Sequence, residues 1–316
     1  MHKTRYNALR LTLEIRQRGP LLIKAGGLSA DPTLPDMQFV RTYHAGKGET
    51  VYIPGSSLKG VVRGFTEKIL RTIDPLPQQP GPDPRKQWKW ACAAFESKEE
   101  KQDKRMWNCP QFLGEQKPKD RDLFSWEVYA CSCGACRMFG HTRLKGRTAF
   151  TDFMPATEIK TEIRYGVAIS RLSHAVAQGP FEMEIAVDGT FKGYLLLENY
   201  ELWQLGLLAL ALESMNQGLV KVGFGKNRGF GEVAATVTEA QVEEAGLQND
   251  PNALRGLAAF VTDEERNRYG LYEPIRLNGL PAPAQSLDLG IYQRRVYDTQ
   301  GWQSIARRAM EALREG

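Results

Sequence analysis

The sequence lacks any long hydrophobic run. Its longest apolar stretch, Leu205 to Leu212, is far shorter than the roughly 20 residues that a membrane-spanning helix needs. The opening residues, MHKTRYNALR, contain no apolar segment with a cleavage site, and they therefore do not resemble a secretory signal. We expect a cytoplasmic protein with no membrane partner.

Cysteine is missing from most of the chain, because all five cysteines lie between residues 92 and 136. In a reducing cytosol, such clustering favours a metal site over disulfides. Cys131, Cys133 and Cys136 place three thiols within six residues, and four sulfur ligands suit a structural Zn²⁺ ion. The alternative is a set of incidental buried thiols.

The fourth ligand of this predicted site is open to three assignments. We expect Cys109, which lies upstream of the other three, and the alternatives are Cys92 and His141. A site closed by four protein ligands has no open position for a reactant. We therefore expect the metal to fasten the segment in place and to take no part in chemistry.

Neither common nucleotide-binding loop is present. In GFGKNRGFGEV (223–233), a G-x-G-x-x-G pattern that starts at Gly223 would need glycine where Arg228 stands. In PGSSLKGV, Val61 stands where a Walker A loop needs lysine. The glycines of the first motif still allow backbone N–H groups to approach a phosphate, beside Lys226, Asn227 and Arg228. The alternative is a tight strand connection with charged surface residues.

The excess of positive charge is concentrated at the front of the chain. Residues 1–70 carry 11 Lys/Arg against 5 Asp/Glu, whereas residues 239–316 carry 9 against 12. Basic surfaces bind phosphate backbones through the release of counterions. The basic front half therefore suits RNA, and the acidic end suits a protein partner.

The hydrophobic pattern predicts an α+β fold. Residues 8–15, 147–154 and 181–187 alternate as strands do, and Asp188–Gly189 followed by an apolar run indicates a hairpin. Residues 200–216 read as an apolar helix that stops near Gly218, 220–224 and 231–237 as the last strands, and 303–315 as a helix. With the helix described next, the order approaches βαββαβ, the ferredoxin-like arrangement of RRM-like folds.

A second predicted helix follows the IPGSS motif. Leu58, Val62 and Phe65 recur with helical spacing, together with Val61 and Ile69, and either Ser56 or Ser57 is placed to cap the helix. Lys59 and Arg63 lie four residues apart on another face, near the N-terminal end, where the helix dipole favours an anion. Ser56, Ser57, Lys59 and Arg63 are therefore predicted RNA contacts, as are Lys226, Asn227 and Arg228 of the glycine-rich motif.

Four motifs in order resemble the RAMP superfamily of CRISPR-associated proteins. They are YIPGSSLKGVVRG (52–64), CRMFG (136–140), RTAFTD (147–152) and GFGKNRGFGEV (223–233). Within this superfamily, the chain resembles the repeated backbone subunit of type III effector complexes. This resemblance implies an RRM-like palm, a β-hairpin thumb between guide and target RNA, and partners that comprise CRISPR RNA, complementary target RNA and other complex subunits.

The resemblance also implies a cutting residue. Backbone subunits that cleave target RNA use an aspartate in the loop before the IPGSS helix, with Mg²⁺ and the RNA 2′-hydroxyl as nucleophile. Asp36 in LPDMQFV is the best match and Asp31 the second, although aspartate beside proline is also a common turn residue. Arg164 and Arg171, in the segment expected to contribute to the thumb, are predicted phosphate contacts, and an exposed hairpin is the alternative.

The resulting domain prediction has three parts. Residues 1–73 and 137–238 form the palm and thumb, 74–136 an inserted zinc-binding segment, and 239–316 a C-terminal extension. The predicted function is a CRISPR RNA-binding subunit that is also an endoribonuclease, with a non-catalytic scaffold as the alternative. A guide-processing nuclease would favour a histidine near the first helix, yet none lies between His44 and His141. A zinc-dependent hydrolase is a further alternative.

Overall fold

The computed structural model describes residues 3–26, 34–73, 91–92, 108–246, 250–272 and 276–313. The strands of its central sheet are β1 (Asn7–Gln17), β4 (Thr148–Phe150), β5 (Met154–Pro155), β8 (Thr190–Glu198), β9 (Val233–Ala245), β12 (Gln285–Asp288) and β13 (Tyr292–Tyr297). They pair antiparallel in the order β12-β13-β9-β1-β8-β4, and β5 also pairs with β8. The predicted α+β class is therefore confirmed.

Strand β1 lies in the middle of the sheet, between β8 and β9. Its alternation is the one that the sequence predicts: Leu9, Leu11 and Leu13 are buried, whereas Arg10 and Arg16 are exposed on the other face. One face of the sheet thus packs against the core, and the other carries polar side chains.

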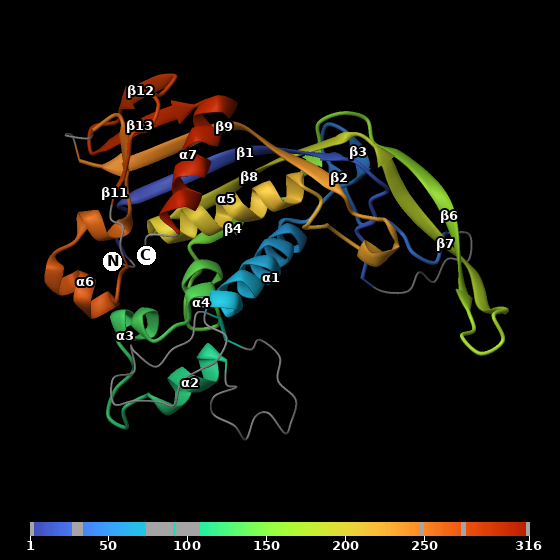
Figure 1. The fold of residues 1–316 in the computed structure, drawn as a ribbon, viewed down its shortest axis with the longest axis horizontal. Coiled ribbons are helices and arrows are strands. Elements are labelled where there is room, and N and C mark those ends of the chain that lie inside the picture. The colour runs from blue at the N-terminus through green and yellow to red at the C-terminus, as the bar shows by residue number, and fades with distance from the viewer. Residues whose placement is uncertain are drawn as a thin grey trace.

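Three long helices pack together beside the sheet: α1 (Gly55–Ile73), α5 (Leu202–Asn216) and α7 (Thr299–Ala312). Helix α5 contacts α1, α7 and β9, so it is surrounded by protein (Figure 1). This explains why 205–212 is apolar on every side rather than on one stripe. As predicted, the helix stops before Gly218, which has a φ of 73°. Within the described ranges, no helix is long and apolar enough to span a bilayer.

A two-stranded hairpin projects from the end of the sheet (Figure 1). It consists of β6 (Lys160–Ile169) and β7 (Val176–Asp188). The hairpin predicted at Asp188–Gly189 is wrong, because β7 pairs with β6 while β8 pairs with β1. Gly189 instead carries the chain from one sheet to the other with a φ of 127°, packed against Glu158 and Ile159. A smaller hairpin joins β2 (Arg41–His44) to β3 (Gly48–Val51).

The predicted insertion contains three short helices in its described part. They are α2 (Cys109–Glu115), α3 (Ser125–Ala130) and α4 (Gly134–Phe139). The predicted boundary at residue 136 falls inside α4, which contacts α1 and β4. Residues 74–90 and 93–107 lie outside the described residues.

The C-terminal segment continues the sheet, although the sequence places a boundary at residue 238. Strand β9 runs across that position, and β13 and then β12 add to its free edge. Helix α7 confirms the helix expected near 303–315 and packs on α5. The remaining elements here are β10 (Ala253–Arg255), a 3-10 turn η5 (Leu257–Phe260), α6 (Asp263–Tyr269) and β11 (Arg276–Asn278).

Candidate nucleic-acid interface and metal centre

A basic groove runs between α1 and the glycine-rich loop. Its cavity has a volume of about 430 Å³. The described residues that line it are Gly60, Val61, Gly64, Phe65 and Lys68 of α1, with Leu219, Val220, Lys221, Lys226 and Asn227 opposite. Three lysines and no acidic side chain are among them, so the groove attracts an anion.

Two glycines of α1, Gly60 and Gly64, line the bottom of this basic groove, and together they are called the glycine floor. Gly60 and Gly64 lie one helical turn apart, and a Cβ atom added to either would meet no other atom within 4 Å. Glycine inside a helix costs about 1 kcal/mol relative to alanine. Because nothing in the described protein requires glycine at these two positions, the space above them is available for a ligand.

One of the lysines, Lys226, has a lowered pKa. Partial burial lowers the pKa of Lys226, and the positive charge of nearby Lys68 lowers it further. Lys226 begins the 3-10 turn η4 (Lys226–Arg228), whose three side chains are exposed. A phosphate placed between Lys68 and Lys226 would neutralise this repulsion.

The glycine-rich loop is held close to the chain around residue 22. The Phe224 N–H donates to the Leu22 carbonyl at 2.7 Å, and a Cβ on Gly223 would lie 2.3 Å from that same oxygen. A Cβ on Gly231 would likewise lie 2.1 Å from the Val222 carbonyl oxygen. Residues 220–224 therefore form a tightly packed connection, and the strand predicted there is wrong.

The start of α1 is organised differently from the prediction. The helix begins at Gly55, so Ser56 and Ser57 lie inside its first turn instead of capping it. The Gly55 N–H donates to Asp152 Oδ1 at 2.9 Å. Because this carboxylate already lies at the helix N-terminus, an anion there would be repelled. Lys59 is half-buried, and this burial, with Arg63 nearby, lowers its pKa.

Arg63, a predicted RNA contact, points into the protein. Its guanidinium donates to Glu67 at 2.8 Å, to the Gly140 carbonyl at 3.1 Å and to Cys136 Sγ at 3.8 Å. The predicted contact with RNA does not match this arrangement, because the Arg63 side of α1 faces α4 and not the basic groove.

Asp36 lies beside the base of the projecting hairpin. Its exposed carboxylate accepts a hydrogen bond from the Glu182 N–H of β7 at 2.9 Å. Arg164 on β6 and Arg171 at the hairpin tip are exposed on the same hairpin. The alternative candidate, Asp31, lies outside the described residues.

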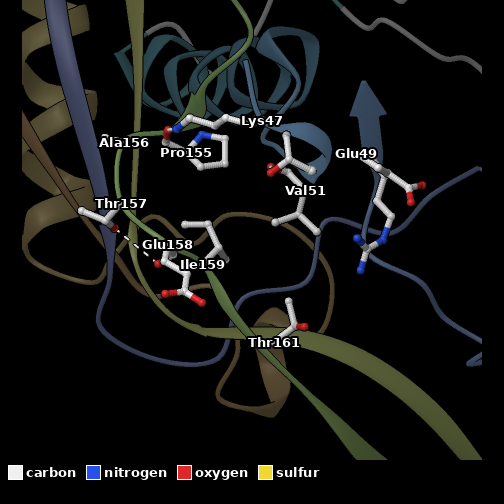
Figure 2. A pocket seen from close by; sticks show the side chains of 11 residues that line it. Lys47, Glu49, Val51, Pro155, Ala156, Thr157, Glu158, Ile159 and Thr161 are labelled. Carbon is white, nitrogen blue, oxygen red and sulfur yellow. Dashed lines mark hydrogen bonds between the residues drawn. The ribbon is translucent and has the colours of Figure 1, made fainter. Parts of the chain in front are cut away.

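A polar cavity of about 440 Å³ lies beside the β2–β3 hairpin (Figure 2). It lies between the β2–β3 hairpin and residues 155–161, which lead into β6. Glu49 and Val51 line one side of it, and Glu158 and Ile159 the other. Arg41 also lines this cavity.

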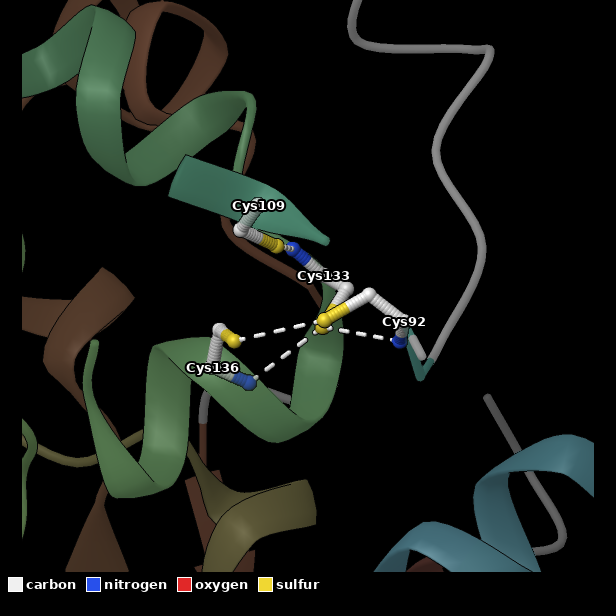
Figure 3. Close-up of side chains that lie close together, drawn as sticks. All are labelled: Cys92, Cys109, Cys133 and Cys136. Atoms are coloured by element: carbon white, nitrogen blue, oxygen red, sulfur yellow. Dashed lines mark hydrogen bonds between the residues drawn. The ribbon is translucent and has the colours of Figure 1, made fainter. Parts of the chain in front are cut away.

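Four buried cysteines, from the start of α2, from α4 and from residues 91–92, converge (Figure 3). The sulfur atoms of Cys92, Cys109, Cys133 and Cys136 all lie within 4.8 Å of one another. A tetrahedral zinc ion with Zn–S bonds of about 2.3 Å sets its sulfurs about 3.8 Å apart. The Cys92–Cys136 separation of 3.7 Å agrees with that value. These four residues can therefore hold a metal such as zinc.

The predicted ligand Cys131 is not in this group, and Cys92 stands in its place. Cys131 follows the end of α3, where its backbone N–H bonds to the Glu127 carbonyl, whereas Cys133 caps α4 and faces Cys136 one turn later. The predicted ligands Cys109, Cys133 and Cys136 are all in the group. His141 is not, because its ring nitrogens contact Ser132 and the Arg143 N–H.

Hydrogen bonds favour a thiolate within the cysteine group. Burial opposes ionisation of Cys133, but hydrogen bonds from the side chains of Cys109, Cys136 and Cys92 hold its pKa well below the usual range. The guanidinium of Arg63 adds a positive charge near Cys136. Metal ligation requires the thiolate form, which Cys133 reaches most readily, whereas burial raises the pKa of Cys109.

Sequence reasoning missed Arg137, which follows Cys136 directly. The side chain is 3% exposed and donates to the carbonyl oxygens of Ala130, at 2.8 Å, and of Gly270, at 2.7 Å. It therefore joins the end of α3 to the end of α6. The signal in the sequence was an arginine inside a cysteine-rich motif. If such an arginine is buried, its five N–H donors need several acceptors, so it connects neighbouring segments.

Comparison with protein families gives one match. The family model described as the RAMP superfamily matches residues 19–234, which is more than half of the chain. The match ends before most of β9, so the C-terminal strands and helices lie outside it. No curated protein matches the chain.

Proposed function

The chain belongs to the RAMP superfamily of CRISPR-associated proteins, which implies RNA binding, and we propose that it is a guide-RNA-binding backbone subunit of a type III interference complex. The observation that carries this proposal is the basic groove, where three lysines and a glycine floor leave room for a phosphate backbone. Other subunits of the complex and the complementary target RNA are the expected partners.

The strand order supports an RRM-like palm. Strands β1, β4, β8 and β9, with helices α1 and α5 between them, follow one another as βαββαβ. Strand β8 lies between β1 and β4, and β1 lies between β8 and β9, as in two interleaved split βαβ units. We place the guide on the α1 side of this palm. The open sheet face is less suited, because Arg10 already covers the ring of Tyr194 at 3.9 Å.

The binding proposal is tested by reversing charge in the basic groove. We expect Lys226→Glu to weaken single-stranded guide binding by at least tenfold, because it replaces an attraction to phosphate with a repulsion. Lys145→Glu, whose side chain is 89% exposed away from the groove lining, is the matched control. Equal affinities of the two variants would contradict this location of the guide.

We further propose that Asp36 supports cleavage of guide-paired target RNA. Its exposed carboxylate lies against β7 of the hairpin that we assign as the thumb, and Arg164 is exposed on the neighbouring strand β6. There it is placed to accept the 2′-hydroxyl proton of a splayed nucleotide. A Mg²⁺ ion held by this carboxylate and by RNA phosphates would stabilise the charge that develops.

Substitution of the aspartate separates this proposal from a pure scaffold. We expect Asp36→Asn to abolish target cleavage in the assembled complex while guide affinity stays within twofold of wild type. Asp288→Asn, an exposed aspartate of the C-terminal strands, is the control. Unchanged cutting in D36N would identify the chain as a scaffold, unless Asp31→Asn abolishes it, which would assign the role to the alternative residue.

We propose that the metal held by the four cysteines is zinc with a structural role. All four ligands come from the protein and are buried, which leaves no position for a substrate. A zinc-dependent hydrolase would need such a position. Removal of zinc should therefore loosen α2 to α4 and leave the arrangement around Asp36 in place.

A further inference from the structure

Residues 36–39, called the Asp36 run below, lie along the edge of β7 like a third strand. The Met37 N–H donates to the Glu182 carbonyl at 3.0 Å, and the Glu184 N–H donates to the Met37 carbonyl at 2.9 Å. Met37 and Met183 form a parallel bridge. Asp36 is thus attached to the projecting hairpin, while residues 38–40 also bond to residues 23–25.

A buried carboxylate adds a second attachment. Glu184 is 7% exposed, and its Oε2 accepts a hydrogen bond from the Phe39 N–H at 3.1 Å. Its other oxygen, Oε1, forms an ion pair with Arg41. The two contacts hold the chain three and five residues after Asp36. The Phe39 ring is buried and stacks on Phe191, which fixes the far end of the run in the core.

The chemistry of these contacts requires a charged carboxylate. A buried charge is stable only when it is paired and hydrogen-bonded, and Arg41 with the Phe39 N–H supplies both. The guanidinium of Arg41 in turn lies at the polar cavity beside β3 and is partly exposed. If Glu184 were removed, the Arg41 side chain could turn toward water, so no buried charge would be left unpaired. We therefore expect the substitution to loosen the Asp36 run without unfolding the protein.

We propose that Glu184 is a positioning residue, which locks the Asp36 run onto the β6–β7 hairpin so that the carboxylate moves with the hairpin. This inference rests on the proposed cleavage function of Asp36. Tyr165, which is 67% exposed, lies directly opposite Glu182 in the register of β6 and β7. Glu184 therefore holds Asp36 on the β7 edge of the hairpin, one strand away from this ring.

The test compares Glu184→Ala and Glu184→Gln with Glu162→Ala, an exposed glutamate of β6 that serves as the matched control. Hydrogen exchange of the Met37 and Phe39 amides reports on the lock directly, and the amides of β1 report on the fold. Single-turnover cleavage of saturating target RNA in the assembled complex reports on positioning, since a displacement of about 1 Å costs about 10²-fold in rate.

We expect E184A to raise exchange at Met37 and Phe39 at least tenfold, with β1 unchanged, and to slow cleavage by 10-fold to 100-fold. Guide affinity should stay within twofold. E184Q should be intermediate in both readouts, because its amide oxygen still accepts the Phe39 N–H while the pairing with Arg41 is lost. The control E162A should match wild type in both.

Several outcomes would overturn the inference. Exchange at Met37 and Phe39 that is unchanged in E184A would show that no lock exists. Faster exchange with an unchanged cleavage rate would show that the lock does not position Asp36. If D36N leaves cleavage intact, the proposed function fails instead, and the exchange data still decide whether Glu184 holds the run.

Discussion

Replacing the glycine floor of the basic groove with alanine should separate RNA binding from folding. Gly60 and Gly64 lie inside α1, and a Cβ atom at either position would meet open space in the free protein. Gly→Ala at compatible helical positions stabilises a protein by about 0.4–1 kcal/mol, chiefly by restricting the unfolded chain. The double variant G60A/G64A should therefore be more stable by about 1–2 kcal/mol.

The same change should weaken RNA binding. Two methyl groups would occupy the floor on which a sugar–phosphate backbone is expected to lie between Lys68 and Lys226. If the backbone is displaced from even one lysine, a loss of about 1.4 kcal/mol lowers affinity tenfold. Stability and affinity thus move in opposite directions, which a substitution that merely damaged the fold would not produce.

The assay pairs denaturant unfolding with fluorescence anisotropy of a labelled guide RNA at fixed salt. Gly114→Ala in α2 is the control, because it too changes a helical glycine, yet lies outside the lining of the groove. We expect it to leave affinity unchanged. Wild-type affinity in G60A/G64A would refute the location of the guide, and a loss of stability would refute the reasoning about open space.

Three other predictions concern the metal and the fold. Cys92→Ser should lose bound zinc in elemental analysis while Cys131→Ser keeps one ion per chain, and the reverse result would contradict the ligand set. Glu244→Gln should lower the free energy of unfolding by about 3–5 kcal/mol, because it leaves the buried guanidinium of Arg295 without its counter-charge. A urea-unfolding shift under 1 kcal/mol would contradict this. Arg137→Lys should speed amide exchange at the ends of α3 and α6, whereas unchanged exchange would show that Arg137 does not join them.

The central elements could be predicted because each follows from local sequence. Alternation along β1, helical spacing in α1 and the glycine that ends α5 are signals within a few residues of one another. The sequence could not show that β9, β13 and β12 continue one sheet, because strand pairing depends on contacts between distant segments. The same limit explains the wrong hairpin at Asp188–Gly189.

The candidate sites show a similar division. Cysteine clustering indicates the group of buried thiols that could hold a metal, but spacing alone favours Cys131 over Cys92, whose thiol comes near the others only through folding. Likewise, Arg63 looks like a surface cation in the sequence, yet it faces the cysteine group. Gly60, Gly64 and Lys68 follow one another at four-residue spacing in the sequence. That they line a basic groove became clear only when the structure placed Lys226 opposite them.

The salt dependence of guide binding tests the basic groove most directly. For single-stranded RNA, each phosphate neutralised by a cation contributes about 0.7 to the slope of log affinity against log salt. The triple variant K68A/K221A/K226A should therefore reduce the magnitude of the slope by about 2 relative to wild type. The control triple variant K117A/K119A/K145A, whose lysines lie outside the groove lining, should keep the wild-type slope. Equal slopes for the two triple variants would contradict guide binding between α1 and the glycine-rich loop.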